Sequence, residues 1–542
     1  MSSAAAADAA EGGSFAGAPA QARAINPWIV AVVVTMATFM ELLDTTIANV
    51  ALPHIAGGLS SGIDESTWIL TSYLVANAVV LPLSAWLSRY FGRKRYYMTC
   101  VALFTISSFL CGLAPSLGVL IFFRVLQGIG GGGLAPCEQA ILVDTFPPAK
   151  RAGAFALYSM AIVTAPAIGP TLGGYITDHF DWRWCFYINV PIGLLSLFLS
   201  NLVVTDSDRM KEEMRKTREE GAKIDFAGIL LVAVAFGCLE VVLDKGQRDD
   251  WFESNFIVTF FTIAMTALAA GIWWELTVKD PVVDLTLLRE RNFALSNFFY
   301  FMFGFILIGS TVMIPQMLQG LFGYTAYQSG WAISPAAFVV VFMAPLVVKF
   351  ILPKFGAMPL IAASFLIQAV ALWHYSQLDL EADYASLIRC RLIQGFGVAF
   401  LFIPVSALAY SYLPKHLNNK ASSLTNLFRN LGSSFGIAFV TTMQARRAQV
   451  HQNFLIEHLQ AGDPRVLANL HSMSNQMIHG GYTSADATLH AEALLAFNMS
   501  NQAGILGFLD VFWLLAWISV ASAMLAFFIR PFDSKGGSAA AE

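Results

Sequence analysis

Charged residues are scarce in this sequence. Asp, Glu, Lys and Arg make up 13% of its 542 residues, whereas hydrophobic residues make up 56%, and an ordinary soluble domain carries about 25% charged residues. The surface of a water-soluble protein cannot be built from that composition. The net charge of −4 is small and spread along the chain, so nothing indicates a nucleic-acid partner or a polybasic lipid-binding tail.

Cysteine pairs and metal-ligand patterns are also missing. The six cysteines form no CxxC pair and lie mostly within apolar runs, so we interpret them as small buried side chains. Five of the nine histidines fall between residues 445 and 502, at spacings that match no metal site. We therefore expect no metal and no cofactor. No cluster of acids, His or Cys marks a membrane-embedded enzyme or sensor, although a channel is harder to exclude.

Apolar runs long enough to cross a bilayer recur along the whole chain. A hydrocarbon core of about 30 Å needs roughly 20 apolar residues per helix. We predict fourteen spanning helices in an all-α integral membrane protein. They lie near residues 28–51, 68–88, 96–114, 118–142, 154–177, 184–204, 225–244, 255–275, 294–318, 330–350, 357–375, 385–411, 422–444 and 505–529.

The distribution of cations orients these helices. With the N-terminus inside, the inner segments hold 22 of the 32 Lys and Arg residues and the outer segments hold six. Because Lys and Arg accumulate in cytoplasmic loops, both termini are predicted to be cytoplasmic.

An internal repeat divides the chain into two halves. The segment Arg124-Val-Leu-Gln-Gly-Ile-Gly130 returns as Arg391-Leu-Ile-Gln-Gly-Phe-Gly397, which pairs helices one to six with nine to fourteen. Parallel repeats of six spans are typical of transporters whose halves rock around a central site. The predicted parts are a disordered tail (1–26), a six-helix half (27–205), a cytoplasmic linker (206–224), two inserted helices (225–278), a second half (292–530) with a long outer loop (445–502), and a cytoplasmic tail (531–542).

Asp44 lies inside the first predicted helix, where a carboxylate is costly unless it is paired or protonated. Arg124 on the fourth helix shares its depth, roughly 10 Å from the outer end at 1.5 Å per residue, so the two can form an ion pair. A carboxylate whose cation can leave picks up a proton, which would supply coupling. A purely structural salt bridge is the alternative. Glu41, three residues earlier, either titrates as well or lines water, and Glu138 is interpreted as a solvated inner edge.

Other polar and aromatic positions are candidates for a cargo cavity. The aromatic ninth helix suits flat apolar molecules, although lipid-facing rings explain many of its residues. The cavity candidates are Asn49, Tyr73, Asn77, Gln127, Phe301, Phe305, Gln316 and Gln368.

Glycines, prolines and cations at helix contacts are assigned to packing and topology instead. These structural candidates are Arg89, Gly92, Arg93, Gly128, Gly169, Pro170, Gly173 and Gly174. Aligned on Pro53 and Pro315, the counterpart of Asp44 in the second half is apolar Ile306, which places coupling in the first half.

These motifs resemble those of the fourteen-helix drug:proton antiporters of the major facilitator superfamily, EmrB/QacA type. The likeness covers the first-helix motif from Leu43 to Pro53, the fourth-helix residues Arg124, Gln127 and Gly128, and the Gly169-Pro170 motif of the fifth helix. The resemblance implies proton coupling at Asp44. The superfamily usually has Asp where this chain has Arg89, which argues against a gating charge pair built on that Asp.

The resemblance implies a proton-coupled multidrug exporter in a bacterial inner membrane, working by alternating access on amphipathic or aromatic compounds. It is expected to be a secondary transporter and not an enzyme. A dedicated exporter of a metabolite, fatty acid or siderophore, or an importer of similar layout, is the alternative. Members with a long outer loop before the last helix pass cargo to a periplasmic membrane-fusion adaptor and an outer-membrane channel, so these partners are implied as well.

Overall fold

The computed structural model describes residues 26–206, 211–212, 214–215, 225–278, 281–410, 413, 417–457 and 464–530. The predicted terminal tails and most of the predicted linker lie outside these ranges. Within them the chain is helical and contains no strand. The first half comprises α1 (Pro27–Gly58), α2 (Ile63–Ser66), α3 (Trp68–Phe91), α4 (Arg93–Gly112), α5 (Leu117–Gly131), α6 (Leu134–Thr145), α7 (Pro148–His179), α8 (Trp184–Tyr187) and α9 (Asn189–Val203).

The inserted pair is α11 (Phe226–Lys245) and α12 (Asn255–Thr277). In the second half, α13 (Arg291–Phe303), the π-helical turn η3 (Gly304–Ile308) and α14 (Gly309–Gly320) form one span. A second span consists of α15 (Ala326–Ile333), α16 (Pro335–Leu346), η4 (Val347–Ile351) and α17 (Leu352–Phe355). The remaining long helices are α18 (Ala357–Tyr375), α19 (Tyr384–Ala409), α20 (Asn418–Glu457), α21 (Pro464–His479) and α22 (Ser484–Leu525).

Helices occupy all fourteen predicted positions, and twelve described segments are long and apolar enough to cross a membrane. The other two predicted spans correspond to α4 and α20. Both helices carry polar residues in their inner parts, such as Arg93 in α4 and Arg429 in α20. They pack among the other helices, α4 against α5 and α9, and α20 against α13 and α22. The bundle therefore supports the predicted all-α membrane fold. Twelve spans meet the length and apolarity criteria, and α4 and α20 are counted as spans only because they pack among the others.

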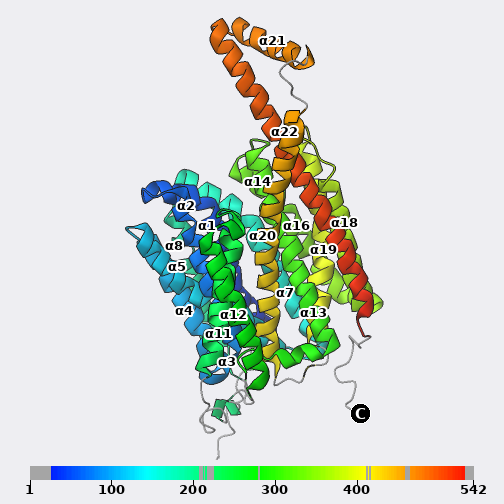
Figure 1. Cartoon of the computed structure of the whole chain (residues 1–542). Coiled ribbons are helices and arrows are strands. Elements are labelled where there is room, and N and C mark those ends of the chain that lie inside the picture. The colour runs from blue at the N-terminus through cyan, green and yellow to red at the C-terminus, as the bar shows by residue number, and fades with distance from the viewer. Residues whose placement is uncertain are drawn as a thin grey trace, which may run out of the picture.

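The two halves stand side by side, with the inserted pair at one seam between them (Figure 1). Helix α11 packs against α3 of the first half and against α20 of the second. At the other seam, α7 packs against α15 and α16. The inserted pair therefore bridges the two halves.

The repeat seen in the sequence reappears in the inner loops. Gly92 ends α3 and starts α4 with φ of 91°, and Gly356 ends α17 and starts α18 with φ of 77°. Only glycine adopts this left-handed region without strain. The same tight turn is thus built at equivalent places in both halves.

The inner side of the bundle is closed by hydrogen bonds from α20 to the first half. The Ser422 hydroxyl donates to the Pro136 carbonyl at 2.7 Å, and the Ser423 hydroxyl donates to the Leu81 carbonyl at 2.7 Å. The Asn426 amide donates to Gln139 Oε1 at 2.9 Å. The polar inner part of α20 is therefore an interface between the halves, which explains its low apolarity.

Most of the described residues in the segment predicted as a long outer loop are helical, and residues 480–483 connect two of its helices. Helix α20 continues to Glu457, α21 lies across the top, and α22 begins at Ser484, so this part projects beyond the rest of the bundle (Figure 1). Asp510 of α22 accepts hydrogen bonds from Arg447 Nε at 2.6 Å and from His451 at 2.8 Å. We call residues 445–502 the outer extension.

Candidate functional site

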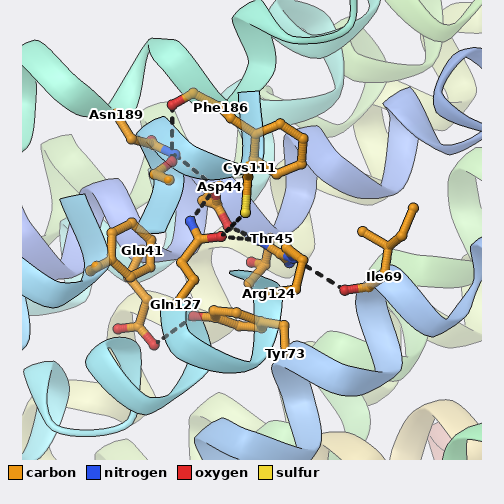
Figure 2. A network of polar contacts seen from close by, with 12 residues as sticks. Glu41, Asp44, Thr45, Ile69, Tyr73, Cys111, Arg124, Gln127, Phe186 and Asn189 are labelled. Atoms are coloured by element: carbon orange, nitrogen blue, oxygen red, sulfur yellow. Dashed lines mark hydrogen bonds and ion pairs between the residues drawn. The ribbon is translucent and has the colours of Figure 1, made fainter. Parts of the chain in front are cut away.

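Asp44 is the centre of a buried polar network in the first half (Figure 2). Its Oδ2 lies 2.6 Å from Arg124 Nη1, so the structure contains the ion pair that the shared depth predicted. Its Oδ1 accepts hydrogen bonds from Gln127 Nε2 at 2.9 Å and from Asn189 Nδ2 at 2.6 Å. Asp44 is 1% exposed and Arg124 is fully buried. Three donors from α5 and α9 thus converge on this carboxylate.

Arg124 is positioned by groups on α3 and α5. Its Nε donates to the Ile69 carbonyl at 3.1 Å, its Nη1 donates to Gln127 Oε1 at 2.8 Å, and its guanidinium lies 4.4 Å from the centroid of the Tyr73 ring. Nη2 has no hydrogen-bond partner. A buried donor beside the ion pair is therefore left unsatisfied.

Close helix contacts bring these side chains together. A Cβ on Gly128 would lie 2.4 Å from the Tyr73 carbonyl oxygen, so glycine is needed where α5 meets α3. A Cβ on Gly169 would lie 2.0 Å from Thr46 Oγ1, and one on Gly173 would lie 3.3 Å from Ile47 Cα. The motif around Pro170 and Gly174 in α7 thus packs against α1 two residues beyond Asp44, as expected for a packing motif.

Glu41 lies one turn inward from Asp44 on α1. It accepts hydrogen bonds from Asn77 Nδ2 at 3.0 Å and from the Tyr73 hydroxyl at 3.3 Å. Tyr73, Asn77 and Gln127 were predicted to line a cargo cavity, but all three are buried within the carboxylate network. Their contacts therefore favour a role in holding Glu41 and Asp44.

The interpretation of Glu138 as a solvated edge is wrong. Glu138 is fully buried, and its Oε1 accepts a hydrogen bond from the Thr35 hydroxyl at 2.5 Å. Helix α1 covers it through Thr35, which its position near the inner end of the predicted helix 118–142 did not reveal. The signal that could have found it is the three-residue spacing of Thr35, Thr38, Glu41 and Asp44 along α1.

The second half builds the same scaffold without an acid. Arg391 Nε donates to the Ile333 carbonyl at 3.2 Å and its Nη1 donates to Gln394 Oε1 at 2.6 Å. The partners in the place of Asp44 are hydroxyls: Gln394 Nε2 donates to Ser310 at 2.9 Å, and Arg391 Nη2 donates to Thr311 at 3.1 Å.

The assignment of Ile306 as the counterpart of Asp44 is therefore wrong. The proline alignment failed because Pro315 follows Ser310 by five residues, whereas Pro53 follows Asp44 by nine. The π-helical turn η3 also changes the register of this span just before Ser310.

The remaining cavity candidates include exposed, half-buried and fully buried side chains. Asn49 on α1 and Gln316 on α14 are exposed, each beyond the buried polar network on its own helix. Phe301 and Phe305 are half-buried and pack against Phe435 and Phe439 of α20, with ring centroids 6.0 and 5.3 Å apart. Gln368 is fully buried beside Gln394. The four phenylalanines form an apolar aromatic cluster between two spans, which we call the aromatic wall.

The inner loop between α3 and α4 uses a different charge pair from the one its family motif suggests. Arg89 lies near the end of α3. Arg93 Nη1 contacts Asp144 Oδ2 at 2.5 Å and donates to the Ala140 carbonyl at 3.1 Å. Asp144 also accepts a hydrogen bond from Asn418 of the second half at 3.2 Å. The charged contact at this loop thus ties α4 to α6 and to the opposite half.

Among the described residues, no group of three or more His, Cys, Asp or Glu side chains is arranged so that it could hold a metal ion. The six cysteines are all free, and five are buried.

Comparisons with known proteins point in one direction. The family model described as Major Facilitator Superfamily matches residues 34–437. The chain is 36% identical to the multidrug export protein EmrB of Escherichia coli strain K12, over 95% of this chain and 97% of that protein. It is 34% identical to the fatty acid resistance protein FarB of Neisseria gonorrhoeae, over 93% and 96%.

Solved structures show the same fold at low sequence identity. The proton:xylose symporter XylE, bound to 6-bromo-6-deoxy-D-glucose, aligns with a TM-score of 0.59 at 15% identity. The alignment covers 93% of this chain and 96% of that one.

Proposed function

The chain belongs to the major facilitator superfamily and, within it, to the drug:proton antiporters, and we propose that it exports amphipathic or aromatic compounds in exchange for protons. The family makes it a multi-pass membrane transporter and not an enzyme. The observation that carries the proton-coupled part is the fully buried pair of Asp44 and Arg124, with Gln127 and Asn189 on the same carboxylate. We place it in a bacterial inner membrane with both termini in the cytoplasm, as the cation distribution favours.

Proton exchange at Asp44 follows from the energetics of a buried carboxylate. While Arg124 lies 2.6 Å away, the charged form is stabilised. When Arg124 leaves, a buried charge without a cation is strongly unfavourable, so Asp44 takes up a proton. Movement of Arg124 away from Asp44 would therefore be linked to proton uptake, and its return to proton release.

Alternating access requires that the two halves rock around the centre. The hydrogen bonds from Ser422, Ser423 and Asn426 close the inner side. The structure thus corresponds to a state whose inner path is shut. In this state, exposed Asn49 and Gln316 are positioned to meet cargo or water arriving from the outer side.

Cargo chemistry is suggested by the aromatic wall of Phe301, Phe305, Phe435 and Phe439, where α13 and η3 meet α20. Flat apolar surfaces suit flat amphipathic molecules. Relatives named for multidrug export support broad cargo. The second candidate is a dedicated fatty-acid exporter, which the likeness to the fatty acid resistance protein favours.

The outer extension is proposed to bind a periplasmic membrane-fusion adaptor that leads to an outer-membrane channel. Its helices project beyond the bundle (Figure 1). They also carry exposed apolar side chains, among them Val450, Phe454 and Leu489. An exposed apolar surface on projecting helices is suited to packing with helices of another protein.

The test is transport by purified protein in proteoliposomes under an imposed pH difference, with ethidium as an aromatic probe and oleate as a fatty-acid probe. Wild-type protein should move ethidium against its concentration gradient. The Asp44→Asn variant should fall to the level of protein-free liposomes, whereas Glu65→Gln, which changes an exposed acid, should behave like wild type. Uphill transport by Asp44→Asn would contradict proton coupling at this residue. Transport of oleate without ethidium would favour the second candidate.

A further inference from the structure

Four polar residues follow one face of α1 toward the inner side of the membrane. Thr35, Thr38, Glu41 and Asp44 are spaced by three residues, so their side chains point in similar directions. At about 1.5 Å per residue, Glu41 lies roughly 5 Å and Thr35 roughly 13 Å inward from Asp44. The acid on α6, Glu138, meets this face at Thr35. Three buried carboxyls therefore lie along one line through the first half.

Glu138 has an incomplete set of hydrogen bonds for a charged carboxylate. Thr35 serves its Oε1, but its buried Oε2 has no partner. The buried hydroxyl oxygen of Thr38, which faces the same carboxyl, also lacks a partner. The Thr38 hydroxyl can donate to Oε2 when Glu138 is charged, and it can accept a hydrogen bond from Oε2 when Glu138 is protonated. The site can therefore serve either protonation state of Glu138, as a proton-binding site requires.

The groups that face Glu138 come from four helices. They are Glu41 of α1, Tyr97 of α4, Tyr158 of α7 and Arg429 of α20. No cation of the described residues lies within ion-pair distance of Glu138 or Glu41. The single positive charge among these neighbours belongs to the opposite half.

Arg429 joins the two halves beside these acids. Its Nη1 donates to the Tyr158 hydroxyl of α7 at 2.8 Å, and its charge interacts with both Glu41 and Glu138. Deprotonated acids would attract Arg429 and favour the closed inner side. Protonated acids would not, because the attraction depends on their negative charge.

We propose that Glu41 and Glu138 form a second proton-binding site, inward of the Asp44–Arg124 pair, whose charge controls the inner closure through Arg429. This rests on the proposed proton coupling and extends it. A proton that has entered at Asp44 passes inward to Glu41 and Glu138. Their neutralisation weakens the hold on Arg429, the inner side opens, and the proton leaves to the cytoplasm.

Infrared difference spectroscopy of the purified protein between neutral and acidic pH reports each protonated carboxyl directly and needs no cargo. Wild-type protein should show separate carboxylic-acid components for Asp44 and for the second site. Glu138→Gln should remove one component that Asp44→Asn leaves in place. The matched control is Glu240→Gln, a buried acid on α11 with a serine partner at 2.9 Å, which should leave the Glu138 component unchanged.

An unchanged infrared spectrum for Glu138→Gln would overturn the proposal. Gln keeps the oxygen that accepts from Thr35, so this variant should fold, and its thermal unfolding is measured alongside. Should it unfold, Thr35→Val provides the second test, because it leaves the carboxyl in place but removes its donor. That variant should shift the frequency of the Glu138 component, and no shift would also overturn the proposal.

Control of the closure is tested with spin labels at Arg95 and Lys354, which are exposed near the inner ends of the two halves. Acidification should lengthen the distance between the labels in wild-type protein. This change should be lost in Glu138→Gln and in Arg429→Gln, and its persistence in both would overturn the proposal. If the spectroscopic and spin-label results are as expected but Asp44→Asn still transports cargo uphill, only the coupling role of Asp44 is contradicted, and the second proton-binding site stands.

Discussion

The two halves contain the same pair of Arg and Gln side chains, but in the first half this pair contacts a carboxylate and in the second half it contacts hydroxyls. Arg124 and Arg391 each donate from Nε to a backbone carbonyl, at 3.1 and 3.2 Å, and from Nη1 to the Gln three residues on, at 2.8 and 2.6 Å. The first half then offers the Asp44 carboxylate, whereas the second offers the hydroxyl of Ser310.

This difference separates structure from coupling. The shared bonds fix the fourth helix of each half against the second, so they belong to the scaffold. The acid is present on one side only, and Arg391 forms no ion pair among the described residues. Removing Arg391 leaves no buried charge without a partner, so the loss of stability should be small. Removing Arg124 would leave the charged Asp44 buried without its cation. Four substitution experiments, each made at matched positions of the two halves or at their inner boundary, test this contrast.

The largest difference is expected from replacing each arginine with methionine. Arg124→Met leaves Asp44 buried without its cation and should lower the free energy of unfolding by about 3–5 kcal/mol. Arg391→Met removes hydrogen bonds to neutral groups only and should lower it by about 1–2 kcal/mol. Chemical denaturation in mixed detergent micelles measures both. Equal losses would show that Asp44 does not distinguish the two sites.

The next difference concerns the glutamines. Gln127→Ala removes a bond to a carboxylate and one from a guanidinium, which should cost about 1.5–3 kcal/mol, because bonds to charged groups are stronger. Gln394→Ala removes a bond to a hydroxyl and one from Arg391, and we expect about 1–2 kcal/mol. The same denaturation assay applies. A larger loss for Gln394→Ala would contradict the assignment of the stronger network to the first half.

Helix contact beside the two networks offers a third comparison. A Cβ at Gly128 would meet the Tyr73 carbonyl oxygen at 2.4 Å, whereas one at Gly395 would meet Val339 Cβ at 2.9 Å and backbone at 3.0 Å. Gly128→Ala should therefore destabilise by about 1–3 kcal/mol, with Gly395→Ala near the lower end of that range. Thermal unfolding of the two variants tests the order. The reverse order would mean that α5 has room to move away from α3.

Much of this arrangement could be predicted from the sequence. Hydrophobic length placed the helices, and the Arg-Gln-Gly repeat revealed the two halves. Counting residues from the helix ends also put Asp44 beside Arg124, because depth in a membrane helix follows from position. These predictions rest on local pattern and on bilayer thickness alone.

Other features depend on packing that local pattern does not encode. Glu138 was misplaced because Thr35 of α1 covers it, and Ile306 was chosen because an alignment on prolines ignores the different spacing and the π-helical turn. The outer extension was expected as a loop, since its polar residues do not cross a membrane, yet long polar stretches can still form helices supported by contacts such as Arg447 with Asp510. Burial, register and helix pairing thus required the structure.

The smallest effect is expected at the inner boundary of the second half, where the charge pair lies at the membrane surface and not within it. Asp284 Oδ2 lies 3.1 Å from Lys420 Nζ, and the Asp284 side chain is 13% exposed. Burial raises the pKa of the Asp284 carboxyl, but hydrogen bonds from Thr286 and the charge of Lys420 outweigh it, so its pKa lies below the usual value. The pair therefore contributes stability above the unfolded pKa of about 4, and this contribution is lost as the pH falls through the folded value.

Asp284→Asn should consequently destabilise the protein by less than about 1 kcal/mol at pH 7, as is usual for pairs near a surface. The difference in unfolding temperature between wild type and Asp284→Asn should shrink as the pH falls below about 4, because the wild-type carboxyl is then protonated as well. Thermal unfolding at a series of pH values measures it, with Asp383→Asn, an exposed acid near the outer end of the same half, as the comparison. A difference that grows in acid would mean that the fold stabilises the protonated form of Asp284, which would contradict the ion pair with Lys420.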